Sequence, residues 1–265
     1  MLEGPRYVDW WMIIQIYEIQ TPVEAESILA LGVDHIGSVL LAKRPMQDFR
    51  LKSTIEAVQS ANRKSCLIPL FSEVETIARA IDYYRPDILH LCDALPIEND
   101  REGELTCIIE RQTELRELFP QIEFMRSIPI AIRGSAHRVP SLALARAFES
   151  VSDWFLTDTW LLSEGQSVGQ DQPVRGYVGI TGQTCDWEIA RQMVRSCRVP
   201  IILAGGISPS NAHAGIVQVQ PAGVDSCTQT NAVDPRGQSI RFRKDPERVK
   251  ALVAAAREAA HRLEV

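Results

Sequence analysis

The chain has 265 residues, of which 45% are hydrophobic and 23% charged, so it can bury a core and has the composition of a globular protein. The formal net charge of -6 argues against nucleic acid or an anionic membrane as a partner, although a local positive patch could still hold a phosphate. No apolar stretch reaches the length of a membrane span, and Met1 is not followed by the segments of a signal peptide, so we expect a cytoplasmic protein.

Alternating strand and helix patterns run along the whole chain. The apolar runs of strand length are nearly continuous rather than alternating, as is typical of parallel strands covered on both faces. Eight such runs are expected, at 12–19, 35–41, 66–71, 88–91, 123–132, 154–157, 201–204 and 222–226.

Helical patterns fill the gaps between these runs. The first begins with Thr21 as the expected N-cap and Pro22 at the first helical position, and Gly32 ends it. The last begins in the same way, with Pro246 after Asp245. The expected helices are 22–31, 51–62, 74–84, 106–118, 141–151, 186–197, 211–219 and 246–263.

Eight strand-helix units predict a single α/β domain over residues 1–265, folded as a (β/α)8 TIM barrel with an N-terminal extension at 1–10. A doubly wound open sheet is the main alternative, but no G-x-G-x-x-G follows the first strand. The segment 159–178 is long for a barrel loop, which is typical of a functional lid or of disorder.

The six cysteines are expected to be reduced core residues. None stands in a CxxC arrangement, and a chain of this length without a secretion signal favours free thiols over three disulfides. The spacing of Cys and His fits no metal site, so we predict no metal and no other cofactor. The cysteines are Cys66, Cys92, Cys107, Cys185, Cys197 and Cys227.

Candidate site residues lie where the strands end, because barrel enzymes build their sites from the carboxyl ends of strands. Asp158 ends the sixth run and can act as a general acid or base if burial raises its pKa. A helix cap or a loop salt bridge is an equally good interpretation from position alone. Among the histidines only His90 lies near the carboxyl end of a strand, and packing in the core is the ordinary role for such a residue.

Small residues at the ends of the seventh and eighth runs predict a phosphate pocket. Gly205 and Gly206 let backbone N–H groups approach an anion, and Ser208 and Asn211 begin a helix whose N-terminus favours negative charge. The stretch DSCT at 225–228 adds small and hydroxyl groups. Plain tight turns would also explain each loop separately.

Five segments in order resemble the phosphoribosylanthranilate isomerase family. GITGQTCDW at 179–187 is similar to the family's GGTG-x-T-F-D-W, and LAGGISPSN at 203–211 to L-A-G-G-L-x-P-x-N. GVDSCT at 223–228 is similar to G-V-D-V-S-S, KDPERV at 244–249 to K-D-P-E-K-V, and GVDHIGSV at 32–39 to G-A-D-A-V-G-F-V. The resemblance covers most of the chain and is strongest from Asp158 onwards.

The resemblance implies a TIM barrel of the ribulose-phosphate-binding type that isomerises a phosphorylated ribosylamine, a step of tryptophan biosynthesis. In that family an aspartate is the general acid on the ribose ring oxygen, and a cysteine is the general base at the adjacent carbon. The aspartate corresponds to Asp158. The phosphate-binding positions correspond to Gly182, Gly205, Gly206, Cys227 and Thr228.

The half of the expected site that would hold the base and the aryl group differs from the family's pattern. The family's first strand ends K-I-C-G-I-T, which places Tyr17 at the cysteine and Glu18 at the glycine. Tyrosine, with an ordinary pKa near ~10 against ~8.5 for cysteine, is a poorer base at neutral pH. The arginine that would bind the anthranilate carboxylate falls on Met46, with Arg44 close by, and the family's Q-L-H-G corresponds to HLCD, which begins at His90.

Three hypotheses follow from these departures. In the first, the chain is an isomerase for another phosphorylated sugar derivative, with Tyr17 or Glu18 as the new base. In the second, it is the family isomerase with a relocated base. The third is a non-catalytic phosphosugar-binding relative, in which a protein partner would contact the loops around Gln166 or Arg236. The first two together are favoured because Asp158 and the glycine loops are present.

Overall fold

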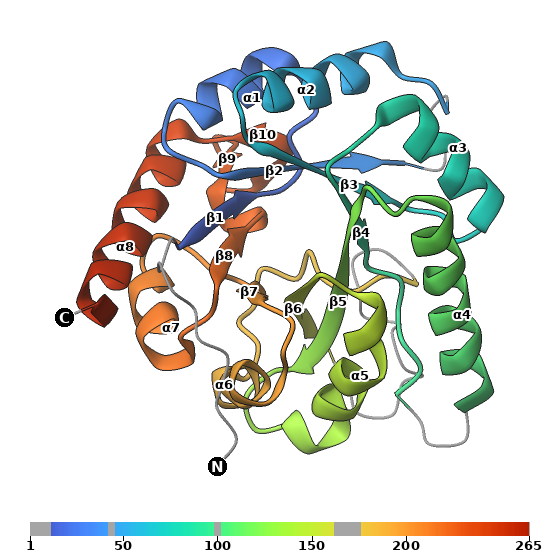
Figure 1. Cartoon of the computed structure of the whole chain (residues 1–265). Coiled ribbons are helices and arrows are strands. Elements are labelled where there is room, and N and C mark those ends of the chain that lie inside the picture. Colours follow the sequence, from blue (N-terminus) through green and yellow to red (C-terminus); the bar gives the residue numbers. More distant parts are fainter. Residues whose placement is uncertain (1–11, 42–45, 98–101, 162–175, 265) are drawn as a thin grey trace.

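Eight parallel strands close into a barrel, as the sequence predicts (Figure 1). The computed structural model describes residues 12–41, 46–97, 102–161 and 176–264. The strands are β1 (Ile13–Ile16), β2 (His35–Leu40), β3 (Lys64–Pro69), β4 (Ile88–Leu91), β5 (Glu123–Ala131), β6 (Trp154–Trp160), β7 (Ile201–Leu203) and β8 (Gly223–Ser226). Strand β6 runs past its expected end, so Asp158 lies within β6, ahead of Thr159 and Trp160.

The helices form an outer ring around these strands (Figure 1). They are α1 (Pro22–Leu29), α2 (Phe49–Ser60), α3 (Val74–Tyr84), α4 (Glu102–Leu118), α5 (Ser141–Phe148), α6 (Trp187–Ser196), α7 (Ala212–Val219) and α8 (Pro246–Glu264). Both predicted N-caps are confirmed: Thr21 Oγ1 accepts from the Glu24 N–H at 3.3 Å, and Asp245 Oδ1 from the Glu247 N–H at 3.0 Å. The predicted extension at 1–10 lies outside the described residues, and the single-domain assignment over 1–265 stays a prediction.

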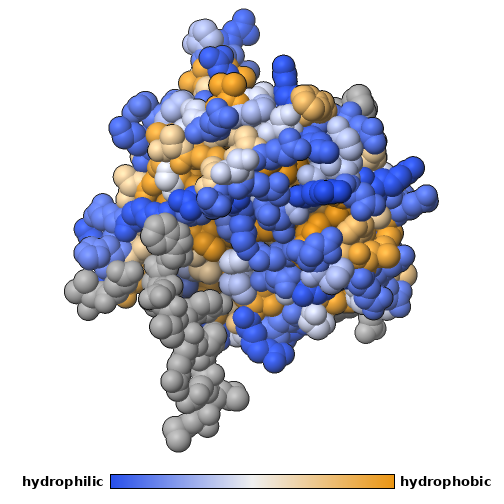
Figure 2. Space-filling view, turned by 45° about the horizontal axis from the view of Figure 1, so that its top comes forward, coloured by the Kyte–Doolittle hydropathy of each residue, from blue (hydrophilic) through white to orange (hydrophobic). Residues whose placement is uncertain are grey.

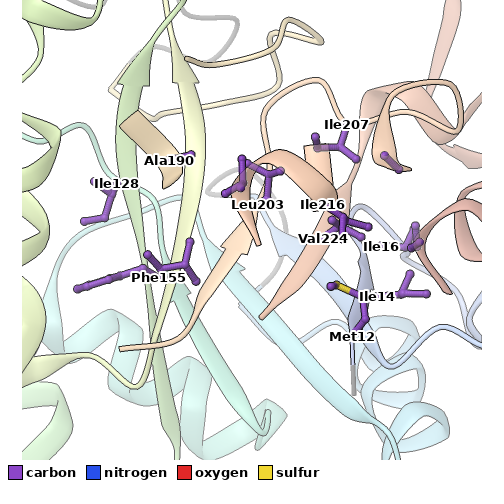
Figure 3. Close-up of a cluster of buried hydrophobic side chains, with 14 of the residues drawn as sticks. Met12, Ile14, Ile16, Ile128, Phe155, Ala190, Leu203, Ile207, Ile216 and Val224 are labelled. Carbon is purple, nitrogen blue, oxygen red and sulfur yellow. The ribbon is translucent and has the colours of Figure 1, made fainter. Parts of the chain in front are cut away.

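The main core lies between the barrel and its helices. Ile14 on β1, Leu203 on β7 and Val224 on β8 are fully buried there, with Ile216 from α7 beside them (Figure 3). A smaller cluster takes its residues from strands around the barrel and includes Tyr17, Cys66, Ile88, Met125, Leu156 and Ile202. In barrels of this kind the inner side chains form a packed core, so we expect a site at the end where the strands terminate.

A two-stranded hairpin lies between β8 and α8, in a stretch for which the sequence predicts no element. It consists of β9 (Asn231–Val233) and β10 (Ser239–Lys244), which pair antiparallel with a bulge. The Lys244 N–H donates to Glu24 Oε1 at 2.7 Å, which ties the hairpin to α1 (Figure 1). The pattern SIRFRK carries too many charges to be recognised as a buried strand, because the hairpin stands outside the barrel.

The visible surface is mostly hydrophilic, with small apolar areas between charged side chains (Figure 2). The described hydrophobic residues that are large and exposed are Val23, Phe49, Leu118, Val217 and Val233. Among the described helices, none is both long and apolar enough to cross a membrane. Within the same residues the six cysteines are all free thiols.

Candidate active site

Two adjoining pockets open where the strands end. The larger has about 550 Å³ of empty space including its mouth, and its apolar wall consists of Val39, Ile68, Leu70, Leu156, Val178 and Ile180. The smaller has about 330 Å³ and is lined by Thr181, Gly182, Gly205, Gly206, Thr228 and Gln229 among others. Asp158, Ile180, Asp225 and Cys227 line both pockets, so the two form one site with a polar and an apolar part.

The smaller pocket is made mainly from backbone. Gly205 and Gly206 have positive φ values of 83° and 62°. Gly205 lies against Thr159 on β6, and Gly206 lies against the loop that precedes α6. A Cβ on Gly205 would come within 2.4 Å of Thr159 Oγ1, and one on Gly206 within 2.5 Å of the Gln183 carbonyl carbon. Glycine is therefore needed at both positions for this turn to approach β6 and the loop before α6, and the N–H groups of the turn can then face an anion.

The loops after β6 and β8 are also joined at this pocket. Gln229 Nε2 donates to the Gly182 carbonyl at 2.8 Å, and Thr159 Oγ1 donates to the Gln183 carbonyl at 2.6 Å. Thr228 begins a 3-10 turn (Thr228–Thr230) directly after Cys227. The five predicted phosphate-binding residues Gly182, Gly205, Gly206, Cys227 and Thr228 thus line one pocket.

Replacing Gly206 by alanine is expected to weaken phosphate binding by about tenfold or more, because the new Cβ would collide with the backbone at Gln183. The measurement is titration calorimetry with inorganic phosphate. Gly134→Ala is the matched control, since Gly134 has a similar φ of 89° with nothing within 4 Å of its added Cβ. Equal phosphate affinity of the two variants would contradict this role for Gly206.

Asp158 projects into both pockets from β6. Its Oδ1 accepts from the Thr159 N–H at 2.8 Å, and Gly179 packs so closely that a Cβ there would lie 2.0 Å from Asp158 Oδ2. Burial raises the pKa of this carboxyl to about 7. Among the described residues it forms no ion pair and caps no helix, so its carboxyl is available for proton transfer near neutral pH.

Asp225, at the end of β8, is a second carboxyl in the site that the sequence reasoning did not single out. It is 6% exposed, and its Oδ1 accepts from Gln15 Nε2 at 3.3 Å. Burial, together with the nearby charge of Asp158, raises the pKa of Asp225 to about 8. The available signal is the position of this carboxyl at the end of the eighth run, where the sequence analysis considers only the small and hydroxyl groups of the stretch 225–228.

Tyr17 follows β1 and is held by a hydrogen-bonded chain. Its hydroxyl lies 2.6 Å from His90 Nδ1, and His90 Nε2 lies 2.8 Å from Ser127 Oγ. The ring lies over Gly37, where a Cβ would come within 1.9 Å of it. Burial raises the pKa of Tyr17 well above its usual value and lowers that of His90 to about 3. Tyr17 is therefore a protonated hydroxyl beside a neutral imidazole, which makes it a hydrogen-bond donor rather than a base.

Glu18 lines the larger pocket and forms an ion pair with the hairpin. It is 2% exposed and has a positive φ of 64°. Its Oε1 accepts from Arg241 Nε at 2.5 Å, whereas its buried Oε2 has no hydrogen-bond partner among the described residues. A positive φ is costly for a residue other than glycine.

The remaining predicted positions are distributed as follows. Arg44 lies outside the described residues, as does Gln166. Met46 packs against the buried cluster around Leu40 and Leu51 and does not line either pocket. The Cys227 carbonyl accepts from Lys244 Nζ at 2.8 Å, and burial raises the pKa of the Cys227 thiol. No group of three or more His, Cys, Asp or Glu side chains in the described part of the chain could hold a metal.

Fold and site together define a (β/α)8 barrel whose backbone loops form a polar pocket at the carboxyl ends of β6 to β8. Residues 120–253 match the family model of N-(5'phosphoribosyl)anthranilate (PRA) isomerase. The chain is 34% identical over 248 residues to the isomerase of Moorella thermoacetica, covering 93% of this chain and 90% of that protein. It belongs to the N-(5'-phosphoribosyl)anthranilate isomerase family, as the resemblance predicts.

More distant relatives agree with this assignment. The isomerase of Methanosarcina acetivorans is 25% identical over 248 residues, covering 91% of this chain and 94% of that protein. The solved phosphoribosyl anthranilate isomerase of Thermus thermophilus superposes with a TM-score of 0.63 at 18% identity, covering 93% of this chain and 99% of that chain. At that identity the superposition supports the shared barrel fold.

Proposed function

We propose that this protein converts an N-(5-phosphoribosyl)amine from its aldose to its ketose form, with Asp158 as the general acid. The observation that carries the proposal is the position of Asp158 on the wall that the two pockets share, with its pKa raised to about 7. A phosphate in the backbone-lined pocket would leave the sugar beside this carboxyl. The rest of the substrate would then lie against the apolar wall.

The acid step opens the ribose ring. Asp158 gives its proton to the ring oxygen, the bond from that oxygen to C1 breaks, and the nitrogen lone pair forms a C=N bond to C1. A base then takes the proton from C2, the released electron pair forms a C1=C2 bond, and the nitrogen recovers its lone pair. The enol becomes a ketone when C1 gains a proton and the C2 hydroxyl loses one. Proton transfers of this kind require only a placed acid and a placed base.

Glu18 is the better candidate for the base. Its carboxylate lines the same pocket as Asp158, and its Oε2 has no partner among the described residues. Tyr17 is disfavoured because its pKa is raised well above the usual value and its hydroxyl is already hydrogen-bonded to His90. We therefore assign proton abstraction at C2 to Glu18 and leave Tyr17 as a wall of the pocket.

Tyr17→Phe is accordingly expected to lower turnover by less than about tenfold, because the ring remains and only a hydrogen-bond donor is lost. The same change should lower the free energy of unfolding by about 1–3 kcal/mol, since His90 Nδ1 is left buried without its partner. Steady-state kinetics and urea unfolding measure the two effects. If turnover falls by a hundredfold or more, Tyr17 rather than Glu18 is the base.

A non-catalytic sugar-phosphate-binding protein is the second candidate. It is favoured by one observation: Glu18 is held by Arg241 and Tyr17 by His90, so both potential bases already have partners. Such a protein would retain the phosphate pocket and bind a sugar phosphate without converting it.

The test is turnover of freshly generated phosphoribosylanthranilate, followed together with binding of ribose 5-phosphate. A phosphoribosyl anthranilate isomerase of this fold has been solved with reduced 1-(o-carboxyphenylamino)-1-deoxyribulose 5-phosphate, and this stable compound serves as a third ligand. We expect turnover and binding of both compounds. Binding of ribose 5-phosphate alone, with no turnover and no binding of the aryl compound, would refute the proposed function and support a binding protein.

A further inference from the structure

A third pocket lies outside the active site, between the neighbouring helices α3 and α4 and the strands that they cover (Figure 1). It has about 280 Å³ of empty space including its mouth. Its apolar lining comes from Phe71, Ile77, Leu91 and Leu115. Of the described residues, only Tyr177 lines both this pocket and the larger active-site pocket, and none is shared with the smaller one. The candidate catalytic groups therefore lie outside the third pocket.

Arg126 on β5 brings a buried charge to this pocket. Its side chain is 1% exposed. Phe124, two residues earlier on the strand, belongs to the apolar cluster under α3 and α4, whereas Met125 belongs to the cluster inside the barrel. Because side chains alternate along a strand, Arg126 points towards the helices. A charged residue is rarely buried so fully unless other groups compensate for the lost water.

The guanidinium of Arg126 is held in one orientation. Its Nε donates to Gln112 Oε1 at 2.9 Å, and its Nη1 donates to Asp93 Oδ1 at 2.6 Å. Its central carbon lies 4.7 Å from the centroid of the Phe148 ring. Gln112 is itself fixed, since its Nε2 donates to the Val151 carbonyl at 2.7 Å. Among the described residues, none accepts a hydrogen bond from Nη2 of Arg126, so a fixed donor is left for a ligand.

The charges of the pocket do not balance. Arg111 on α4 donates through Nη2 to Asp93 Oδ2 at 2.9 Å, so both oxygens of Asp93 accept from arginines. Although burial opposes ionisation, Arg126 and Arg111 lower the pKa of Asp93, which is therefore a carboxylate at neutral pH. Burial raises the pKa of Tyr177 to about 12, so its hydroxyl is uncharged. The described lining residues thus contain two guanidinium groups against one carboxylate, an excess of one positive charge.

We propose that this pocket binds a small aliphatic monocarboxylate. Its carboxylate would accept from Nη2 of Arg126 and from Arg111, whose side chain is 30% exposed and can be reached from the mouth. Its short chain would lie against Phe71 and Leu115. A single negative charge cancels the excess, whereas a phosphate dianion would leave a buried negative charge in its place. This binding site is separate from the proposed function and does not depend on it.

An NMR titration with butyrate, observed on the ligand, tests this proposal. Butyramide has nearly the same shape without the charge, and the wild type should bind butyrate at least about tenfold more tightly than butyramide. Arg111→Gln removes the excess charge and should weaken butyrate binding by about tenfold or more. Arg191→Gln, which removes a partly exposed arginine from α6, is the matched control and should bind butyrate as the wild type does. Arg126→Met would leave Asp93 and Gln112 short of a buried partner, so Arg111 is the better position to change.

Two further variants locate the bound butyrate. Ser72 lines the third pocket, and Ser72→Phe should block butyrate by filling the space while both arginines remain. Arg241→Met removes the cation of the larger active-site pocket and should leave butyrate affinity unchanged. Affinity lost in Arg241→Met but kept in Arg111→Gln would place the ligand in the active site and overturn the proposal. A wild type that does not bind butyrate, or that binds butyramide equally well, would also overturn it.

Discussion

Asp158→Asn is expected to lower turnover of phosphoribosylanthranilate by about 10²- to 10⁴-fold, the usual contribution of a placed general acid. The amide has nearly the same shape and can still accept from the Thr159 N–H, but it cannot give a proton to the ring oxygen. In the wild type the rate should fall as pH rises through about 7, because the raised pKa of Asp158 marks the loss of that proton. Steady-state kinetics across this range would measure both effects.

Binding and a second asparagine variant serve as controls for this result. Affinity for ribose 5-phosphate should be retained in Asp158→Asn, since the phosphate loops are untouched. Asp186→Asn makes the same chemical change at the N-cap of α6, where asparagine caps as well as aspartate, and it should leave turnover near that of the wild type. If Asp158→Asn turns over at the wild-type rate, Asp158 is not the acid.

The contribution of Asp225 to the free energy of unfolding is expected to fall as pH rises from about 4 to about 8. The folded-state pKa of about 8 lies above the unfolded value of about 4, so the native state binds this proton more tightly. The stabilisation is complete below about pH 4 and is lost as pH rises through the folded pKa. Each tenfold difference in proton affinity is worth about 1.4 kcal/mol, so the total is on the order of several kcal/mol.

Asp225→Asn isolates this contribution, because its amide oxygen can still accept from Gln15 while no proton is bound. Urea unfolding of both proteins between pH 5 and pH 8 gives the measurement. The variant should gain stability relative to the wild type as pH rises, whereas contributions from groups that do not interact with Asp225 cancel in the comparison. A difference between the two proteins that does not vary with pH would show that Asp225 ionises as readily in the folded state as in the unfolded chain.

The barrel and the grouping of the glycine loops in one pocket could be predicted from sequence because their determinants are local. Continuous apolar runs such as that of β7 indicate parallel strands, and Thr21 followed by Pro22 indicates where a helix begins, to within a few residues. The paired Gly205 and Gly206 permit a backbone conformation that few other residues adopt. Each of these signals lies within one turn or one strand.

The other half of the site was decided by tertiary structure, since its determinants are distances between remote residues. The ion pair of Glu18 and Arg241 joins positions 223 residues apart, through a hairpin whose charged pattern gave no strand signal. Tyrosine is already a poorer base than cysteine, and the contact of Tyr17 with His90 and its burial, which only the fold shows, disfavour it further. The pKa of Asp225 likewise depends on Asp158, which lies on another strand. The sequence determined which strand-end residues reach the mouth of the barrel, whereas their charges and partners follow from burial and proximity, which only the folded chain establishes.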